Sequence, residues 1–171
     1  MEYSEIHRDE GGSRIRRIQE HPRFRELCAA LCEAEAERPF CRHTTAHFLD
    51  VARLMYIYCL EDGADLEKDV IYAAALLHDL GRREQQLSGT PHEEAGARIA
   101  GDILADCGFS EAEIRSVQRA ILGHRREAQA GDDRFAAYLY RADKGSRNCA
   151  ACSARAECSW PDEKKNLWME Y

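Results

Sequence analysis

The sequence predicts an all-α fold, a helical bundle followed by a short cysteine-containing C-terminal tail. Apolar residues recur at intervals of three and four along most of the 171 residues, which is the spacing of one helix face. Helix-start and helix-stop residues separate these segments, among them Pro22, Gly108 and Ser110. The segments are arranged around residues 73–79, an apolar run that ends in an adjacent histidine and aspartate.

Composition limits the classes of protein to which the chain can belong. A hydrophobic fraction of 44% is ordinary for a globular protein, and 171 residues can form one domain with a sizeable core. No apolar stretch approaches the roughly 20 residues of a membrane span, and the N-terminus has no signal-peptide pattern. We therefore expect a cytoplasmic protein that binds no membrane. A net charge of −7 argues against binding to extended nucleic acid.

We expect three parts: an N-terminal arm over residues 1–21, a helical domain over 22–147, and a cysteine-rich tail over 148–171 packed on or extending the domain. The arm is polar and basic, and should be poorly packed apart from a short helix over about 14–20. Pro22 suits the first turn of a helix that runs to about residue 37. Cys28 and Cys32 share one face of it, where buried small hydrophobes are expected rather than ligands.

The next two helices carry the first histidines. A long helix over about 41–61 places His47 on its apolar stripe, with His43 one turn earlier on the same side. The following helix, over about 66–80, contains the central apolar run. Residues 82–89 are polar and are expected to form a loop.

Three further helices complete the predicted domain. Thr90 and the residues up to Glu93 form a capping box for a helix to about residue 107, in which Gly96 would permit close helix approach. Ser110 begins a second capping box, for a helix to about residue 125. The last helix is expected over about 133–147.

Five polar residues align with apolar helical stripes, each on a different helix: His47, His78, His92, His124 and Asp143. Asp79 adjoins one of them. Any one of these could be a hydrogen-bonded core residue, because a buried unpaired imidazole or carboxylate is costly. A common centre where the five helices converge explains all of them together. Mixed imidazole and carboxylate donors suit one or two divalent first-row metals, namely Fe, Mn, Co, Ni or Zn.

The order His47, His78-Asp79, Asp143 resembles that of the HD superfamily of metal-dependent phosphohydrolases, and Val51-Ala52 follows His47 at the expected offset. The resemblance covers about residues 40–147 and implies an HD-domain-like helical bundle. It implies that these four residues hold one metal. It also implies that Asp79 bridges to a second metal, as in the dinuclear branches of the superfamily.

The second ion would be held by His92 and His124, whose surroundings resemble those in a branch that hydrolyses diadenosine tetraphosphate. His43 would lie behind the ligands or face the substrate. Asp79, Arg82 and Lys144 are candidate catalytic residues. Arg82 and Lys144, next to ligand positions, would clamp phosphate, and Arg125 is a further candidate for binding the substrate. The alternative for each cation is a helix-end charge favoured by the helix dipole.

The tail contains Cys149, Cys152 and Cys158, and Cys41 could supply a fourth thiolate. This spacing favours a structural zinc or iron–sulfur site, and the alternative is free thiols in a loop. Eight cysteines without an export signal argue against a disulfide framework. A short C-terminal helix ending near Trp168 is expected to follow.

The resemblance implies hydrolysis of a phosphate ester or anhydride, of a nucleotide or similar small phosphate, through a metal-bound hydroxide. Two alternatives remain: a non-catalytic HD-fold module that binds a nucleotide or partner, and a di-iron protein of the oxygenase type. The partner expected is a small phosphorylated substrate, and the sequence does not decide between a monomer and a homodimer.

Overall fold

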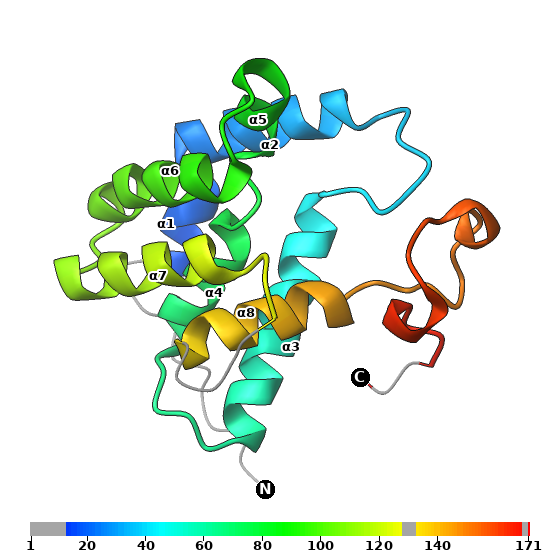
Figure 1. Ribbon diagram of the computed structural model, residues 1–171. Coiled ribbons are helices and arrows are strands. Elements are labelled where there is room, and N and C mark those ends of the chain that lie inside the picture. Colours follow the sequence, from blue (N-terminus) through cyan, green and yellow to red (C-terminus); the bar gives the residue numbers. More distant parts are fainter. Residues whose placement is uncertain (1–12, 128–132, 169–170) are drawn as a thin grey trace, which may run out of the picture.

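The computed structural model describes residues 13–127, 133–168 and 171, and in this part of the chain every regular element is a helix (Figure 1). The all-α prediction is confirmed. No helix among these residues is both long and apolar enough to cross a membrane. The α-helices are α1 (Arg14–Glu20), α2 (Pro22–Ala34), α3 (Thr45–Glu61), α4 (Lys68–Leu77), α5 (Arg82–Ser88), α6 (His92–Asp106), α7 (Glu111–Gly123) and α8 (Arg134–Gly145).

Helix α4 is the centre of the bundle. It packs against α3, α6 and α7, and α8 lies across α3 and α7 (Figure 1). Apart from Tyr72, every residue from Val70 to Leu77 is buried. The alanines at 73–75 keep this helix thin, so neighbouring helices can approach its axis. The C-terminal end of α4 therefore lies in the protein interior, and so does His78, which follows it.

Two glycines join the end of α4 to α6. A Cβ added at Gly81 would lie 2.1 Å from the carbonyl oxygen of His92 and 2.5 Å from the nitrogen of Gly96. A Cβ at Gly96 would lie 3.1 Å from the carbonyl oxygen of His78. The close approach predicted from Gly96 is confirmed. It places the first residue of α6 beside the His78-Asp79 pair.

The segment predicted as a polar loop is helix α5, so that prediction is wrong. Gly81 precedes it, and Gly89 ends it with a φ of +79°, a backbone conformation that glycine adopts readily. Its residues have no apolar stripe and none is buried, which is why periodicity failed. The predicted helix over 66–80 is correspondingly shorter, because α4 ends at Leu77.

Two predicted helix starts differ in the structure, and a third is confirmed. Pro91 is the N-cap of α6 without a side-chain cap, and the Thr90 hydroxyl pairs with Ser88 instead, so the first capping box is wrong. Helix α3 begins at Thr45, so His43 precedes it. The second capping box, at Ser110, is confirmed in full.

The start of the chain is better packed than predicted. Ile18 of α1 is fully buried, and the Arg14 guanidinium pairs with Glu67, Asp69 and Glu113 of the domain. The expectation of a poorly packed arm is therefore wrong for residues 13–21, whereas residues 1–12 lie outside the described part. The three-part division of the chain stays a prediction.

Two expectations for the cysteines and the tail also fail. Cys32 is exposed, so the expectation of a buried hydrophobe is wrong for it, whereas Cys28 is half-buried and packs against the core. In place of the C-terminal helix, the described tail has two short 3₁₀ helices, η1 (Arg155–Glu157) and η2 (Asp162–Lys164).

The tail leaves the end of α8 and folds back near it (Figure 1). One side-chain amide anchors it: the nitrogen Nδ2 of Asn166 lies 2.6, 3.1 and 3.0 Å from the carbonyl oxygens of Lys144, Gly145 and Arg147. The tail is thus tied to the helix that carries Asp143.

Candidate metal centre

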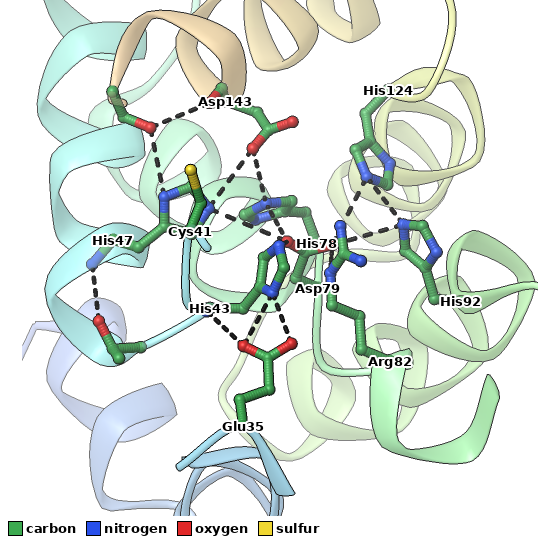
Figure 2. A network of polar contacts seen from close by, with 12 residues as sticks. Glu35, Cys41, His43, His47, His78, Asp79, Arg82, His92, His124 and Asp143 are labelled. Atoms are coloured by element: carbon green, nitrogen blue, oxygen red, sulfur yellow. Dashed lines mark hydrogen bonds and ion pairs between the residues drawn. The ribbon is translucent and has the colours of Figure 1, made fainter. Parts of the chain in front are cut away.

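The donors predicted from five helical stripes meet at one place (Figure 2). Three of the histidines sit at helix ends: His78 and His124 follow the last residues of α4 and α7, and His92 is the first residue of α6. His47 lies in the first turn of α3, and Asp143 near the end of α8. The helical framework therefore brings these side chains to one point.

One group of donors consists of His47, His78, Asp79 and Asp143, and each offers one atom within 4.8 Å of the others. The His78 nitrogen Nε2 lies 3.1 Å from Asp79 Oδ2, and the His47 nitrogen Nε2 lies 3.4 Å from Asp143 Oδ1. The side chains of His78 and Asp79 are fully buried. Four convergent imidazole and carboxylate donors are a complete set for a first-row metal.

A second group consists of Asp79, His92 and His124. The Asp79 oxygen Oδ1 lies 3.4 Å from His92 Nε2 and 3.8 Å from His124 Nε2. Its other oxygen, Oδ2, faces the first group. Asp79 therefore belongs to both groups and offers a different oxygen to each.

Hydrogen bonds on the far side fix the ring orientation of all four histidines. The Nδ1–H groups of His78 and His124 donate to the carbonyl oxygens of Ala75 and Ile121 in their own helices, at 2.8 and 2.5 Å. The other two rings are held by side chains: His92 Nδ1 donates to Gln85 Oε1 at 2.9 Å, and His47 Nδ1 to Ser146 Oγ at 3.2 Å. Each Nε2 then carries a lone pair that faces the centre, as in metal-ligating histidines.

Several of these facing atoms have no hydrogen-bond partner. They are His47 Nε2, His78 Nε2 and both carboxylate oxygens of Asp79, all buried. In the second group, the Nε2 atoms of His92 and His124 face one another at 3.4 Å. Buried acceptors without donors are costly, and a cation between them satisfies them. The residues present therefore fit one or two divalent metals.

Electrostatics favours the metal-binding protonation states. Burial alone would raise the pKa values of Asp79 and Asp143, but both are held well below the usual range. The charge of His78 is the main opposing cause at Asp79, and the hydrogen bond with His47 is the main one at Asp143. Burial, together with the charge of Arg82, lowers the pKa of His92 to about 4. The carboxylates are then ionised and His92 neutral at pH 7, as metal ligation requires.

His78 shows the need for positive charge at the centre most directly. Burial lowers its pKa, but the adjacent Asp79 carboxylate outweighs burial, so the pKa is raised. The raised pKa of His78 therefore reflects the negative charge of Asp79 in a fully buried place. A metal cation held there would be stabilised by the same charge.

His43 lies beside the centre and is held by Glu35. The His43 nitrogen Nδ1 lies 2.8 Å from Glu35 Oε1, and its backbone N–H donates to Oε2 at 2.7 Å. Its Nε2 lies 3.6 Å from Asp79 Oδ2 (Figure 2). Glu35 is only 4% exposed. Its role could not be predicted from the sequence, because a glutamate at a helix end is usually solvated.

Of the predicted clamps, Arg82 and Lys144 lie at the centre. The Arg82 nitrogen Nε is 2.7 Å from Asp79 Oδ1 without hydrogen-bond alignment, and Lys144 Nζ donates to Asp143 Oδ2 at 2.5 Å. Arg125 is half exposed and pairs with Glu93 at 3.0 Å.

Arg147, which was not predicted, places its Nη2 3.4 Å from Asp143 Oδ1. Its position four residues after Asp143, on the same helical face, was the available signal.

These side chains open onto one large cleft of about 1730 Å³. Its lining contains nine lysines and arginines but only four aspartates and glutamates. The whole chain has a net charge of −7, so the excess of positive side chains in this cleft is local and opposite in sign to the charge of the protein. It suits an anionic small molecule.

The thiols of the predicted cysteine site are not gathered as the donors of the His/Asp centre are. The groups in the described chain whose donors lie within 4.8 Å of one another contain only histidine and aspartate, so Cys149, Cys152, Cys158 and Cys41 are not gathered that closely. Burial raises the pKa of Cys41, with Arg147 opposing and the nearby thiols of Cys149 and Cys152 adding to the rise. Cys41 therefore lies next to the tail. A metal bound by these thiols stays a prediction.

The fold and the centre together define a class: an all-α protein with a buried His/Asp metal site. The sequence model of the HD domain matches residues 44–148, and the chain belongs to the HD domain family. The resemblance inferred from the motifs is confirmed. The chain is also 43% identical, over 137 residues, to an uncharacterized protein of Clostridium beijerinckii. That match covers 80% of this chain and 85% of the relative.

A solved structure has the same fold. It is a crystal structure of a predicted HD superfamily hydrolase from an uncultured Thermotogales bacterium, with a TM-score of 0.60 and 24% identity. The similarity covers 85% of this chain and 83% of the other.

Proposed function

We propose that this HD domain protein is a metal-dependent phosphohydrolase that cleaves a phosphate ester or anhydride of a nucleotide or similar small phosphate. The observation that carries the proposal is the Asp79 carboxylate. Its two buried oxygens accept no hydrogen bond, and they face two groups of imidazole and carboxylate donors beside a cationic cleft. This arrangement supports metal-assisted chemistry on an anion.

The donor set suits Fe, Mn, Co, Ni or Zn. Such an ion, when bound, lowers the pKa of a coordinated water from about 15.7 to about 7 and neutralises charge on phosphoryl oxygens. His47, His78, Asp79 and Asp143 would hold one ion, and Asp79, His92 and His124 a second.

The cations at the centre would bind the substrate. Arg82 faces Asp79, and Lys144 faces Asp143. Once a metal neutralises these carboxylates, the two cations are available to phosphate oxygens. Both are then positioned to stabilise charge that develops during phosphoryl transfer.

His43 would present an unprotonated ring nitrogen beside the same centre. Hydrogen bonds from His43 hold the pKa of Glu35 low against the opposing effect of burial, so Glu35 is ionised and accepts from Nδ1–H. Burial lowers the pKa of His43 itself to about 4. At pH 7 its Nε2 is therefore an unprotonated acceptor, suited to orienting a water or a substrate hydroxyl.

The test is a screen of metal-loaded protein against phosphomonoesters, nucleotides and dinucleoside polyphosphates, with phosphate and nucleotide release as the readout. The expected result is metal-dependent release from at least one compound, lost in Asp79→Asn and kept in Asp102→Asn, an exposed aspartate paired with Arg23. Tight nucleotide binding without turnover would favour the non-catalytic module. Oxygen uptake by the iron-loaded protein would favour the oxygenase-type alternative.

A further inference from the structure

Arg147 is one of the least exposed cations in the cleft. Its side chain is 10% exposed, and its guanidinium carbon lies 4.2 Å from the centre of the Trp160 ring. Its Nε is buried and has no hydrogen-bond partner. The guanidinium plane is thus held by stacking, and its Nη2, 3.4 Å from Asp143 Oδ1, is directed toward the candidate metal centre.

Lys144, in the last turn of α8, lies beside it. Its ammonium is 5.7 Å from the Trp160 ring centre and 5.3 Å from that of Tyr140. Both cations contact Asp143, one at each carboxylate oxygen. Two fixed positive charges therefore flank one candidate metal ligand.

The tail supplies the aromatic wall that holds these cations. Trp160 follows the last tail cysteine, and the tail is tied to Lys144, Gly145 and Arg147 through Asn166. Trp160, Lys144 and Arg147 line the same cleft as His92 and His124. The tail therefore forms part of the cleft wall rather than an appendage remote from the centre.

We propose that Lys144, Arg147 and Trp160 form a subsite for a second phosphate, which adapts the cleft to substrates with a diphosphate or longer phosphate chain rather than to monophosphates. The inference rests on the proposed function and deepens it. A phosphoryl group at the metals would place its neighbouring phosphate near Asp143. Once Asp143 binds a metal, the fork of Arg147 is free for that phosphate.

The role of Trp160 is positioning. Stacking fixes the guanidinium plane, so less conformational freedom is lost when the two parallel N–H groups meet phosphate oxygens. A tail without this ring would leave the charge of Arg147 in place but not its orientation. The substrate class inferred is a nucleoside di- or triphosphate or a related polyphosphate.

The test measures binding by calorimetry with manganese-loaded protein in excess Mn²⁺. The ligands are imidodiphosphate, a diphosphate analogue with a non-hydrolysable bridge, and inorganic phosphate. Wild type should bind imidodiphosphate at least about tenfold more tightly than phosphate. Arg147→Gln and Trp160→Ala should each weaken imidodiphosphate binding about tenfold and phosphate binding by less than about twofold, as loss of one charge-assisted contact predicts.

The matched control is Arg115→Gln, which removes an exposed arginine paired with Glu111 on α7 and should change neither affinity. Trp160→Phe keeps a ring and should retain most of the preference. If Arg147→Gln loses its helical circular dichroism, Arg147→Lys replaces it and should lose about the same preference, because a lysine lacks the planar fork.

Equal affinity of wild type for the two ligands would overturn the subsite, and so would variants that bind both ligands like wild type or lose both equally at unchanged metal content. The measurement needs no turnover. The subsite can therefore fail while the hydrolysis screen succeeds, and a failed screen with a retained preference would refute only the proposed reaction.

Discussion

The His/Asp centre and the cysteine tail are the two regions in which the sequence predicts a metal, and they are built in opposite ways. The donors of the centre are scattered along the chain on five helices, yet they lie within 4.8 Å of one another in two groups. The tail cysteines are close in sequence, yet no three thiols of the described chain meet that closely. Closeness along the chain is therefore a poor guide to a formed site.

The difference lies in what holds the donors. The helices of the centre are fixed by a core of fully buried side chains around α4, and each histidine is oriented by a hydrogen bond to its Nδ1. The tail consists of turns and two short 3₁₀ helices, and Asn166 supplies much of its anchoring. A packed framework prepares the donor geometry before any ion binds.

The largest effect should come from Asp79, the residue common to both donor groups. Asp79→Ala removes a carboxylate oxygen from each group, so activity in the phosphate-release screen should fall by more than about a hundredfold. Asp102→Ala, at an exposed position, should keep activity. Activity retained in Asp79→Ala would mean that the two groups do not form the reaction centre.

The next effect tests the packed framework itself. Gly81→Ala places a Cβ against the backbone of His92 and Gly96, and should lower the free energy of unfolding by about 2–3 kcal/mol in urea titrations. The control is Gly101→Ala, a glycine within α6 at which the added Cβ meets only the flexible end of Gln118. It should change stability by less than about 1 kcal/mol. Equal effects would show that close approach at Gly81 is unimportant.

The pH dependence of stability should report the buried His43. Its folded pKa of about 4 lies below the ordinary 6.5, so between these values the unfolded chain binds a proton that the folded chain does not. Stability therefore rises with pH across this window, by up to about 3 kcal/mol for this residue. Urea titrations in EDTA from pH 4.5 to 7.5 should show the rise, and it should be smaller in His43→Gln. A flat profile in wild type would contradict the burial of a neutral His43.

The smallest effect concerns the tail. Asn166→Ala removes the amide that faces three carbonyl oxygens, and should speed hydrogen exchange in residues 148–168 by about tenfold while the core helices keep their protection. Asn148→Ala, which removes a single acceptor for the N–H of Ala151, should have a weaker effect. Uniformly faster exchange through α4 would show that the tail is part of the core.

Much of the centre could be predicted because helical periodicity reports which face of a helix is buried. His47, His78, His92, His124 and Asp143 each continue an apolar stripe, and a stripe can be read without knowing the partners of its helix. The sequence order of the motif then indicated the family. Each of these side chains lies on the apolar face of its own helix, and these faces pack around one shared core.

What could not be predicted depends on contacts between distant segments. Glu35 is buried only because His43 returns to it across the turn between α2 and α3. Helix α5 has no apolar stripe, and its boundaries are set by the close contact at Gly81 and by Gly89. Arg147 has a sequence signal in its spacing from Asp143, but its stacking on Trp160 of the tail could not be predicted.

The most direct test of the central claim is elemental analysis of the chain purified without chelator or added metal, together with His92→Ala and with Cys149→Ser/Cys152→Ser. A two-ion His/Asp centre predicts about one fewer first-row metal per chain in His92→Ala, and these ions unchanged in the cysteine variant. A single metal, unchanged in His92→Ala and lost with the cysteines, would contradict the centre and assign the metal to the tail.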